Sequence, residues 1–151
     1  MDTPDALVIG AGPAGLMAAE VLAAAGHSVL IADAMPSPAR KFLMAGKSGL
    51  NLTKDEPLPE FLSHYHPQAA QLNAAVSGFG PQEVITWAEG LGQKVFTGST
   101  GRVFPVAMKA SPLLRTWLAR LAGLGVRLIS RWRWTGWDGE AAVFATPEGE
   151  R

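Results

Sequence analysis

The amino-terminal part of the chain carries apolar runs separated by glycine-containing turns. Residues 6–9 and 27–32 are short apolar runs that predict strands. Neither run alternates with polar residues, which is typical of parallel strands covered on both faces. Between them, residues 14–25 are rich in Ala, Leu and Met and predict a helix that ends at Gly26. The pattern therefore predicts a βαβ unit.

The middle of the chain predicts short helices and a hairpin. An irregular segment comes first, with Pro36, Pro38 and a glycine-rich stretch at 45–49. We then expect helices at 59–65, 68–76 and 81–91, followed by strands at 94–96 and 102–104 that are joined by a turn at 98–101.

The carboxyl-terminal part predicts a crossover helix and further strands. Ser111 is expected to cap the helix, with Pro112 at its first position. Strands are expected at 126–129, 131–134 and 142–146. Residues 147–149 read as a turn into a hairpin whose returning strand we do not expect within the chain. Because folded domains avoid such an open edge, the sequence predicts the front part of a longer protein.

These elements predict an α/β fold of the Rossmann-like type. We expect a βαβ unit with a parallel sheet plus a β-meander, incomplete, with an inserted helical segment. The predicted domain organisation is a first part at 1–55, an intervening helical segment and hairpin at 56–105, and the crossover helix, third parallel strand and start of the meander at 106–151.

Composition narrows the class of protein. The 151 residues are 48% hydrophobic and 17% charged, with 13 basic and 13 acidic residues, so the chain reads as globular. Cysteine is absent, which excludes disulfides and thiolate metal sites and fits a cytoplasmic protein. The apolar stretch 6–26 contains Glu20 and several glycines and lacks a basic leader, so we expect neither a signal peptide nor a membrane span.

Charge is unevenly placed along the chain. No acidic residue occurs between Glu89 and Asp138, where eight Lys and Arg residues lie. These bases can attract an anionic substrate, bind nucleic acid or cover a solvated face; the pI near 6.8 argues against nucleic acid. Arg102 is a weak candidate for substrate contact. His27, His64 and His66 lack a metal-binding spacing, so no metal is expected.

The strongest chemical signal is a glycine-rich turn between the first strand and the first helix. It consists of Gly10, Ala11, Gly12, Pro13, Ala14 and Gly15. In such a GxGxxG turn the first glycine permits a tight bend, the second lets the backbone approach a pyrophosphate, and the third lets the helix pack closely on the strand. The helix N-terminus then faces the phosphates.

An acidic residue follows at the expected place. Asp33 ends the second predicted strand, 18 residues after Gly15. A carboxylate there accepts hydrogen bonds from the ribose hydroxyls of a dinucleotide and repels a 2′-phosphate, which disfavours NADP at this site. The alternative is a glycine-rich turn in an α/β protein that binds no dinucleotide.

The chain resembles the YhiN/BaiN-like flavoproteins. The resemblance rests on the GAGPAG turn, on residues 38–53 (PARKFLMAGKSGLNLT), on 101–105 (GRVFP) with 109–111 (KAS), and on 134–137 (WTGW). It covers essentially the whole chain. Many members carry an Arg-Cys pair where this chain has Gly49 and Leu50, so any role of that pair does not transfer.

The resemblance implies a Rossmann-like FAD-binding domain, with FAD lying across the first βαβ unit. By the matching positions, the flavin side or the pyrophosphate would be lined by Arg40, Lys41, Gly46, Lys47 and Asn51. The backbone near Trp134 would meet the adenine. Independently of the family, Gly46, Gly49 and Lys47 suit close approach to a phosphate or a flat ring, or form an ordinary surface loop.

The sequence therefore predicts the FAD-binding portion of a flavin-dependent oxidoreductase. The resemblance implies NAD(P)H as the electron donor, while the acceptor and the catalytic residues are not predicted. Two alternatives stay open. The chain can be a dinucleotide-binding module without turnover, or an NAD-dependent dehydrogenase that uses the same turn.

Overall fold

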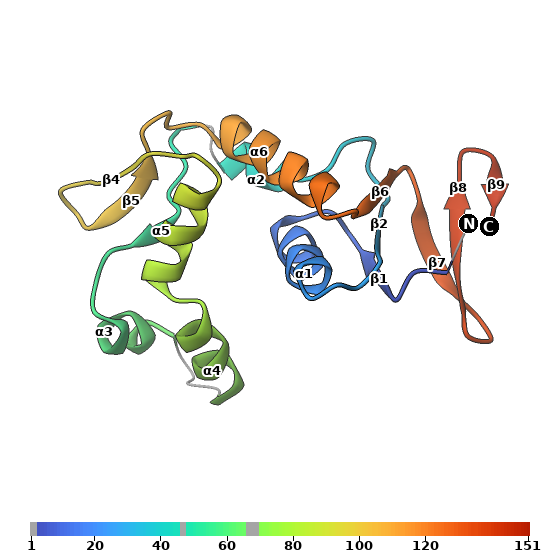
Figure 1. The fold of residues 1–151 in the computed structure, drawn as a ribbon, viewed down its shortest axis with the longest axis horizontal. Helices are drawn as coiled ribbons and strands as arrows, with labels where there is room; N and C mark the ends of the chain where they lie inside the picture. The colour runs from blue at the N-terminus through green and yellow to red at the C-terminus, as the bar shows by residue number, and fades with distance from the viewer. Residues whose placement is uncertain (1–2, 46–47, 66–69) are drawn as a thin grey trace. The chain divides into compact units, whose positions relative to one another are not determined.

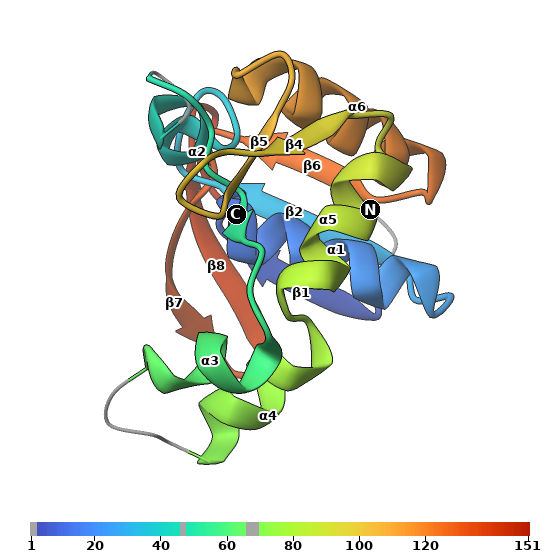
Figure 2. The same ribbon diagram turned by 90° about the vertical axis from the view of Figure 1, so that its left-hand side faces the viewer.

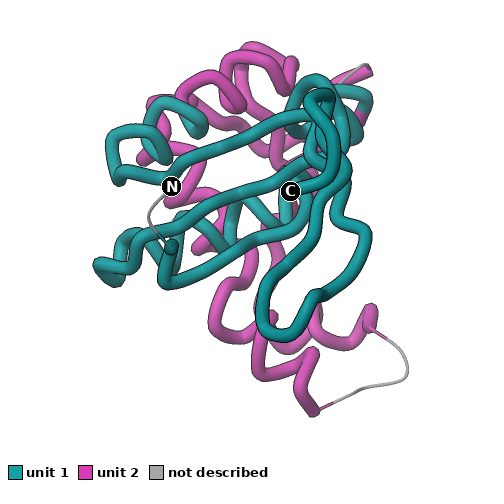
Figure 3. Tube along the Cα trace, turned by 90° about the vertical axis from the view of Figure 1, so that its right-hand side faces the viewer, with its two compact units in different colours: residues 1–44, 117–151 teal, residues 45–116 magenta. Residues whose placement is uncertain are grey.

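The computed structural model describes residues 3–45, 48–65 and 70–151. Contacts divide the chain into two compact units, one formed by Met1–Met44 with Trp117–Arg151 and the other by Ala45–Thr116 (Figure 3). The division falls within helix α6 (Ala110–Gly123). The segments that begin and end the chain thus belong to the same unit.

The first unit is built on the predicted βαβ motif. Strand β1 (Ala6–Ile9), helix α1 (Pro13–Ala24) and strand β2 (Val29–Asp33) follow one another, and β1 pairs with β2 in parallel (Figure 1). Strand β6 (Arg127–Ser130) pairs in parallel with the other edge of β2, which gives the order β1-β2-β6. Every residue of β2 is buried, as its unbroken apolar pattern predicted.

Different elements cover the two faces of this sheet. Helix α1 lies on one side with Leu16, Ala19 and Ala23 buried, and the β-meander lies on the other (Figure 1). The meander consists of β7 (Arg133–Asp138), β8 (Ala141–Thr146) and β9 (Gly149–Glu150), paired antiparallel in the order β7-β8-β9.

Three local expectations differ from the structure. Helix α2 (Arg40–Ala45) lies in the segment predicted to be irregular, because Pro38 and the glycine-rich stretch masked a short run of helix-forming residues. Ser111 lies inside α6, which begins one residue earlier, and so does not cap it. The returning strand expected to be missing begins within the chain as β9, where Phe144 and Arg151 exchange backbone hydrogen bonds.

The apolar stretch at 6–26 forms a strand, a turn and a helix rather than one continuous helix. Within the described ranges, no helix has the length and apolar character needed to cross a membrane.

Glu20 connects α1 to α6. Its Oε2 accepts a hydrogen bond from the indole Nε1 of Trp117 at 2.6 Å, and its Oε1 accepts one from Nη1 of Arg120 at 2.9 Å. The Glu20 side chain is 13% exposed, and Trp117 is 1% exposed. A buried carboxylate is stable when it is paired and hydrogen-bonded, which explains an acid in an otherwise apolar helix.

We expect Glu20→Ala to lower the free energy of unfolding by about 2–3 kcal/mol, because it leaves the buried Trp117 N–H without this acceptor. Glu20→Gln keeps an acceptor oxygen and is expected to cost less than half as much. Urea denaturation of the purified variants measures both. Equal losses for the two variants would contradict the importance of the indole hydrogen bond.

The second unit combines an antiparallel sheet with short helices. Strands β3 (Thr53–Lys54), β4 (Val95–Thr97) and β5 (Arg102–Pro105) pair in the order β3-β5-β4, which contains the predicted hairpin. The helices are α3 (Leu58–Ser63), α4 (Ala70–Gly78) and α5 (Pro81–Gly90), close to the predicted ranges (Figure 2). Residues 68 and 69 of the second predicted helix lie outside the described residues.

Candidate functional site: the β1–α1 loop and the end of β2

The first glycine of the β1–α1 loop is required by its backbone. Gly10 has a φ of +101°, a conformation that residues with a Cβ rarely adopt. Its N–H donates to the carbonyl oxygen of Ala32 at 2.8 Å, which holds the start of the turn against β2. Gly10 therefore permits the tight bend, as the spacing predicted.

The third glycine is required by packing. A Cβ built on Gly15 would lie 1.9 Å from the carbonyl oxygen of Gly10 and 3.2 Å from Cγ1 of Val8. The nearer of these atoms belongs to the backbone and cannot rotate away. Gly15 thus lets α1 approach β1 more closely than any other residue would allow.

Neither backbone conformation nor packing requires a glycine at the second position of the motif. Gly12 has ordinary extended dihedrals of −77° and 177° at the start of α1. A Cβ built there would meet no atom of the described residues within 4 Å. The space beside Gly12 is therefore open, which is the arrangement that a pyrophosphate close to the backbone requires.

Asp33 organises the loops around this space. Its Oδ2 accepts a hydrogen bond from the N–H of Ala11 at 2.5 Å, and its Oδ1 accepts one from the N–H of Met35 at 2.7 Å. The residue is 8% exposed. A carboxylate has about four acceptor positions, so these two bonds leave others for the hydroxyls of a ligand.

Six of the predicted cofactor residues line one pocket of about 250 Å³. Its lining includes the predicted cofactor residues Ala11, Gly12, Pro13, Asp33, Arg40 and Lys41. Ligand sites typically measure about 300–1,000 Å³, so this pocket suits one part of a dinucleotide rather than the whole. The pocket lining thus includes the carboxylate of Asp33 and the cationic side chains of Arg40 and Lys41.

The other predicted site residues lie elsewhere or are not placed. Gly46 and Lys47 fall outside the described residues. Asn51 is exposed and belongs to the second unit. Ala14 lies in the first turn of α1, beside Gly15.

Trp134 lies on β7 and does not line the pocket. Its ring packs edge-on against Trp137, with centroids 6.0 Å apart. The backbone contacts near the end of β2 come instead from the two residues that precede β7: the N–H of Arg131 donates to the carbonyl oxygen of Met35, and the N–H of Trp132 donates to that of Asp33. A role of Trp134 toward adenine stays a prediction.

Sequence reasoning missed Met35, Ser37 and Ala39, which also line the pocket. Ala39 has a φ of +55° and donates its N–H to the carbonyl oxygen of Ala11 at 2.8 Å. A positive φ is uncommon outside glycine and signals a position held by its surroundings. No residue-type signal in the sequence could have found it.

A larger open depression of about 600 Å³ runs along the meander, lined by residues of β7, β8 and the chain end. It contains none of the residues of the β1–α1 loop. We therefore take the smaller pocket, where backbone amides, glycines and the Asp33 carboxylate converge, as the candidate functional site.

We expect Asp33→Ala to destabilise the chain even without a ligand, by about 2–3 kcal/mol, because two backbone N–H groups lose a charged acceptor. Urea denaturation of the ligand-free variant measures this loss. Unchanged stability would mean that Asp33 does not position the loop, and that any effect on binding comes from the ligand contact alone.

A known protein family matches nearly the whole chain. A family model described as HI0933-like protein Rossmann domain matches residues 4–150. The chain belongs to this family. The resemblance to YhiN/BaiN-like flavoproteins is thereby confirmed at the level of the family, and so is the α/β Rossmann-like fold.

Solved structures share the fold of this HI0933-like chain. A 3-ketosteroid-Δ4-(5α)-dehydrogenase from Rhodococcus jostii RHA1 matches with a TM-score of 0.68 and 17% identity, over 97% of this chain and 43% of that one. A flavocytochrome c3 fumarate reductase matches with a TM-score of 0.66 and 21% identity, over 95% and 30%. THI4 from Thermovibrio ammonificans matches with a TM-score of 0.56 and 16% identity, over 93% and 47%. The chain spans less than half the length of each.

Proposed function

We propose that this HI0933-like chain binds FAD, with the pyrophosphate against the β1–α1 loop and the adenosine ribose at Asp33. The observation that carries the proposal is Gly12, a glycine that neither the backbone conformation nor the packing of the chain requires. Family membership and the flavocytochrome named above support FAD over other dinucleotides.

The residues of the β1–α1 loop and of the pocket fit a bound FAD. Gly12 leaves a cradle that a side chain would fill, and α1 begins there, so its first-turn N–H groups would bind the phosphates. Pro13 at the first helical position has no N–H to satisfy. Arg40 and Lys41, on the same pocket, would neutralise phosphate charge.

Asp33 sets the preference among nucleotides. Its carboxylate lines the pocket while two backbone N–H groups hold it in place. Such a group accepts hydrogen bonds from a ribose 2′-hydroxyl and repels a 2′-phosphate. This arrangement favours FAD or NAD over NADP at this site.

When bound, the isoalloxazine of FAD would supply the redox chemistry, and a reduced nicotinamide would serve as its electron donor. We propose that the protein serves as the FAD-binding portion of an oxidoreductase. The role of this chain's own residues is to hold and orient the dinucleotide. A cytoplasmic location, expected from the lack of cysteine, stays a prediction.

The test is a titration of the purified 151-residue chain with FAD, followed by quenching of flavin fluorescence. Saturable binding that NAD displaces weakly and NADP does not displace supports the proposal. Binding of NAD in preference to FAD would instead favour a dehydrogenase that uses the same turn.

Electron transfer is tested separately on the FAD-loaded chain. Anaerobic addition of NADH or NADPH is expected to bleach the flavin absorbance. FAD binding without bleaching by either donor would favour the alternative of a binding module without turnover.

A further inference from the structure

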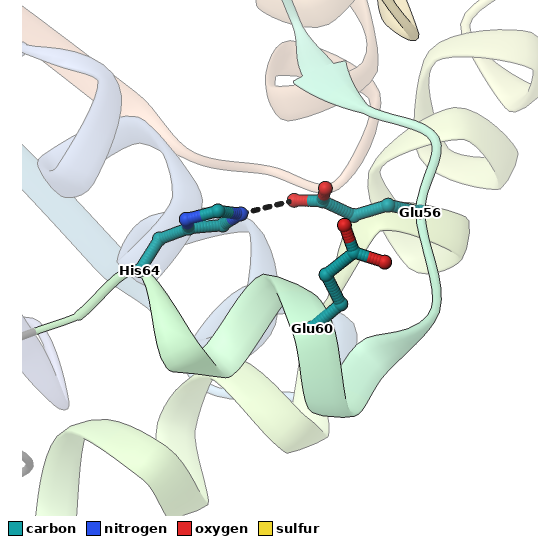
Figure 4. A group of neighbouring side chains, drawn as sticks. All are labelled: Glu56, Glu60 and His64. Atoms are coloured by element: carbon teal, nitrogen blue, oxygen red, sulfur yellow. Dashed lines mark ion pairs between the residues drawn. The ribbon is translucent and has the colours of Figure 1, made fainter.

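The second unit holds a group of metal-ligating side chains far in sequence from the nucleotide loop. Glu56 precedes helix α3, Glu60 lies within it, and His64 follows its end (Figure 4). The ligand atoms of the three residues all lie within 4.8 Å of one another. Residues four apart share one face of a helix, which brings Glu60 and His64 to the same side.

We propose that Glu56, Glu60 and His64 bind a single Zn²⁺ ion through one oxygen from each carboxylate and Nε2 of the imidazole. This proposal does not depend on FAD binding, because the residues belong to the second unit.

A buried and unsatisfied oxygen points to a cation at this place. The Glu56 side chain is only 6% exposed, and its Oε1 is inaccessible to solvent. Among the described residues, this oxygen accepts no hydrogen bond. Buried carboxylate oxygens are normally satisfied by donors or by a metal, and the contact of Oε1 is with His64, which is itself a proposed ligand.

The Oε1 atom of Glu56 faces Nε2 of His64 at 3.1 Å, as Figure 4 shows. The two groups form an ion pair when the imidazole is protonated. Zinc binds nitrogen and oxygen ligands at about 2.0–2.2 Å with tetrahedral angles, which separates two ligands by roughly 3.3 Å. The observed separation is therefore close to that of two ligands sharing one ion.

Glu60 can complete the set. Its side chain is exposed, and its carboxylate is directed toward that of Glu56 in Figure 4. A change of rotamer in an exposed glutamate has a low cost, so the remaining gap can close when an ion is present. Solvent would supply the fourth ligand, as zinc sites with three protein ligands allow.

Lys54 supports the proposed site from the other side of Glu56. Its ammonium pairs with Oε2, which leaves Oε1 for the ion. The hydrogen bond from Lys54 lowers the pKa of the Glu56 carboxyl, outweighing the opposing effect of desolvation, and the His64 contact lowers it further. The Lys54 ion pair therefore holds Glu56 in place without occupying the oxygen that would bind the ion.

Two further acidic residues near Glu56 add negative potential at the proposed site. Asp55 and Glu83 line a pocket of about 170 Å³ together with Glu56.

An imidazole nitrogen with two carboxylates suits Zn²⁺, whereas Mg²⁺ and Ca²⁺ prefer oxygen ligands alone. The alternative is a chain of ion pairs, Lys54–Glu56–His64, in which the imidazole is protonated and no metal binds.

The experiment is a Zn²⁺ titration of the untagged 151-residue chain against a chromophoric chelator, with circular dichroism as the check on folding. We expect one ion per chain with a dissociation constant below about 100 µM, and no competition from millimolar Mg²⁺ or Ca²⁺. Absence of saturable Zn²⁺ binding would overturn the proposal in favour of ion pairs.

Substitutions locate the ion. His64→Ala is expected to weaken Zn²⁺ binding at least about tenfold, and because this side chain is 56% exposed its removal is expected to leave the fold intact. Glu60→Gln should weaken it as well. The matched control is His27→Ala in the first unit, which should leave binding unchanged. Binding that survives His64→Ala, or that is lost in His27→Ala, would overturn the assignment.

Discussion

Gly12→Val is expected to abolish FAD binding while the chain stays folded. The valine side chain would project into the space that Gly12 leaves open, where the pyrophosphate approaches the backbone. We expect the dissociation constant for FAD to rise at least about a hundredfold, equivalent to roughly 2.7 kcal/mol. The measurement is the fluorescence titration described above, on both the variant and the parent chain.

The fold of the Gly12→Val variant is expected to change little. In the part of the chain that the structure describes, a Cβ at this position meets no atom within 4 Å, and the backbone dihedrals suit any residue. Replacing glycine at a helix N-cap costs at most about 1 kcal/mol. A variant that binds FAD as the parent does would remove the pyrophosphate from this loop and with it the proposed function.

Gly15→Ala is expected to have the opposite signature, a large loss of stability from one methyl group. The new Cβ would lie 1.9 Å from the carbonyl oxygen of Gly10, so α1 and β1 would have to move apart. Overpacking typically costs 1–3 kcal/mol, and we expect about 3 kcal/mol or more here because the clashing atom is backbone. Domains have only about 5–15 kcal/mol of stability to lose.

Urea denaturation of the ligand-free chain measures the effect of Gly15→Ala. Gly12→Ala is the matched control, since it adds the same methyl group three residues earlier in open space. Similar stabilities for the two alanine variants would show that the close packing of α1 on β1 is not what requires Gly15. The pair thus separates a glycine needed for the fold from one needed for the ligand.

Local pattern sufficed for the two strands of the βαβ motif in the first unit. The apolar runs at 6–9 and 27–32 became β1 and β2 within two residues at each end. Strand β2 is buried throughout and β1 is partly exposed, yet both are continuous apolar runs, so their pattern carries the information by itself. Motif spacing likewise predicted the tight bend at Gly10 and the close packing at Gly15, because both follow from positions within one turn; the pyrophosphate contact of Gly12 stays a prediction.

Short helices and caps were less predictable. The residues of α2 are followed by a glycine-rich stretch, and a helix of six residues has little intrinsic stability to reveal in its sequence. The start of α6 was misplaced because Ser111 is a good cap by residue type, while the helix begins one residue earlier, at Ala110.

The sequence by itself determined the βαβ unit, the glycine turn and the acid that ends β2, because these follow from periodicity and from spacing within one turn or one strand. Only the tertiary structure decided what Glu20, Ala39 and Glu56 do. Each meets its partner through packing: Glu20 contacts a tryptophan 97 residues away, Ala39 adopts a positive φ against the turn, and Glu56 becomes buried beside an imidazole. Burial and long-range hydrogen bonds depend on which segments the fold brings together, and residue type alone does not specify that.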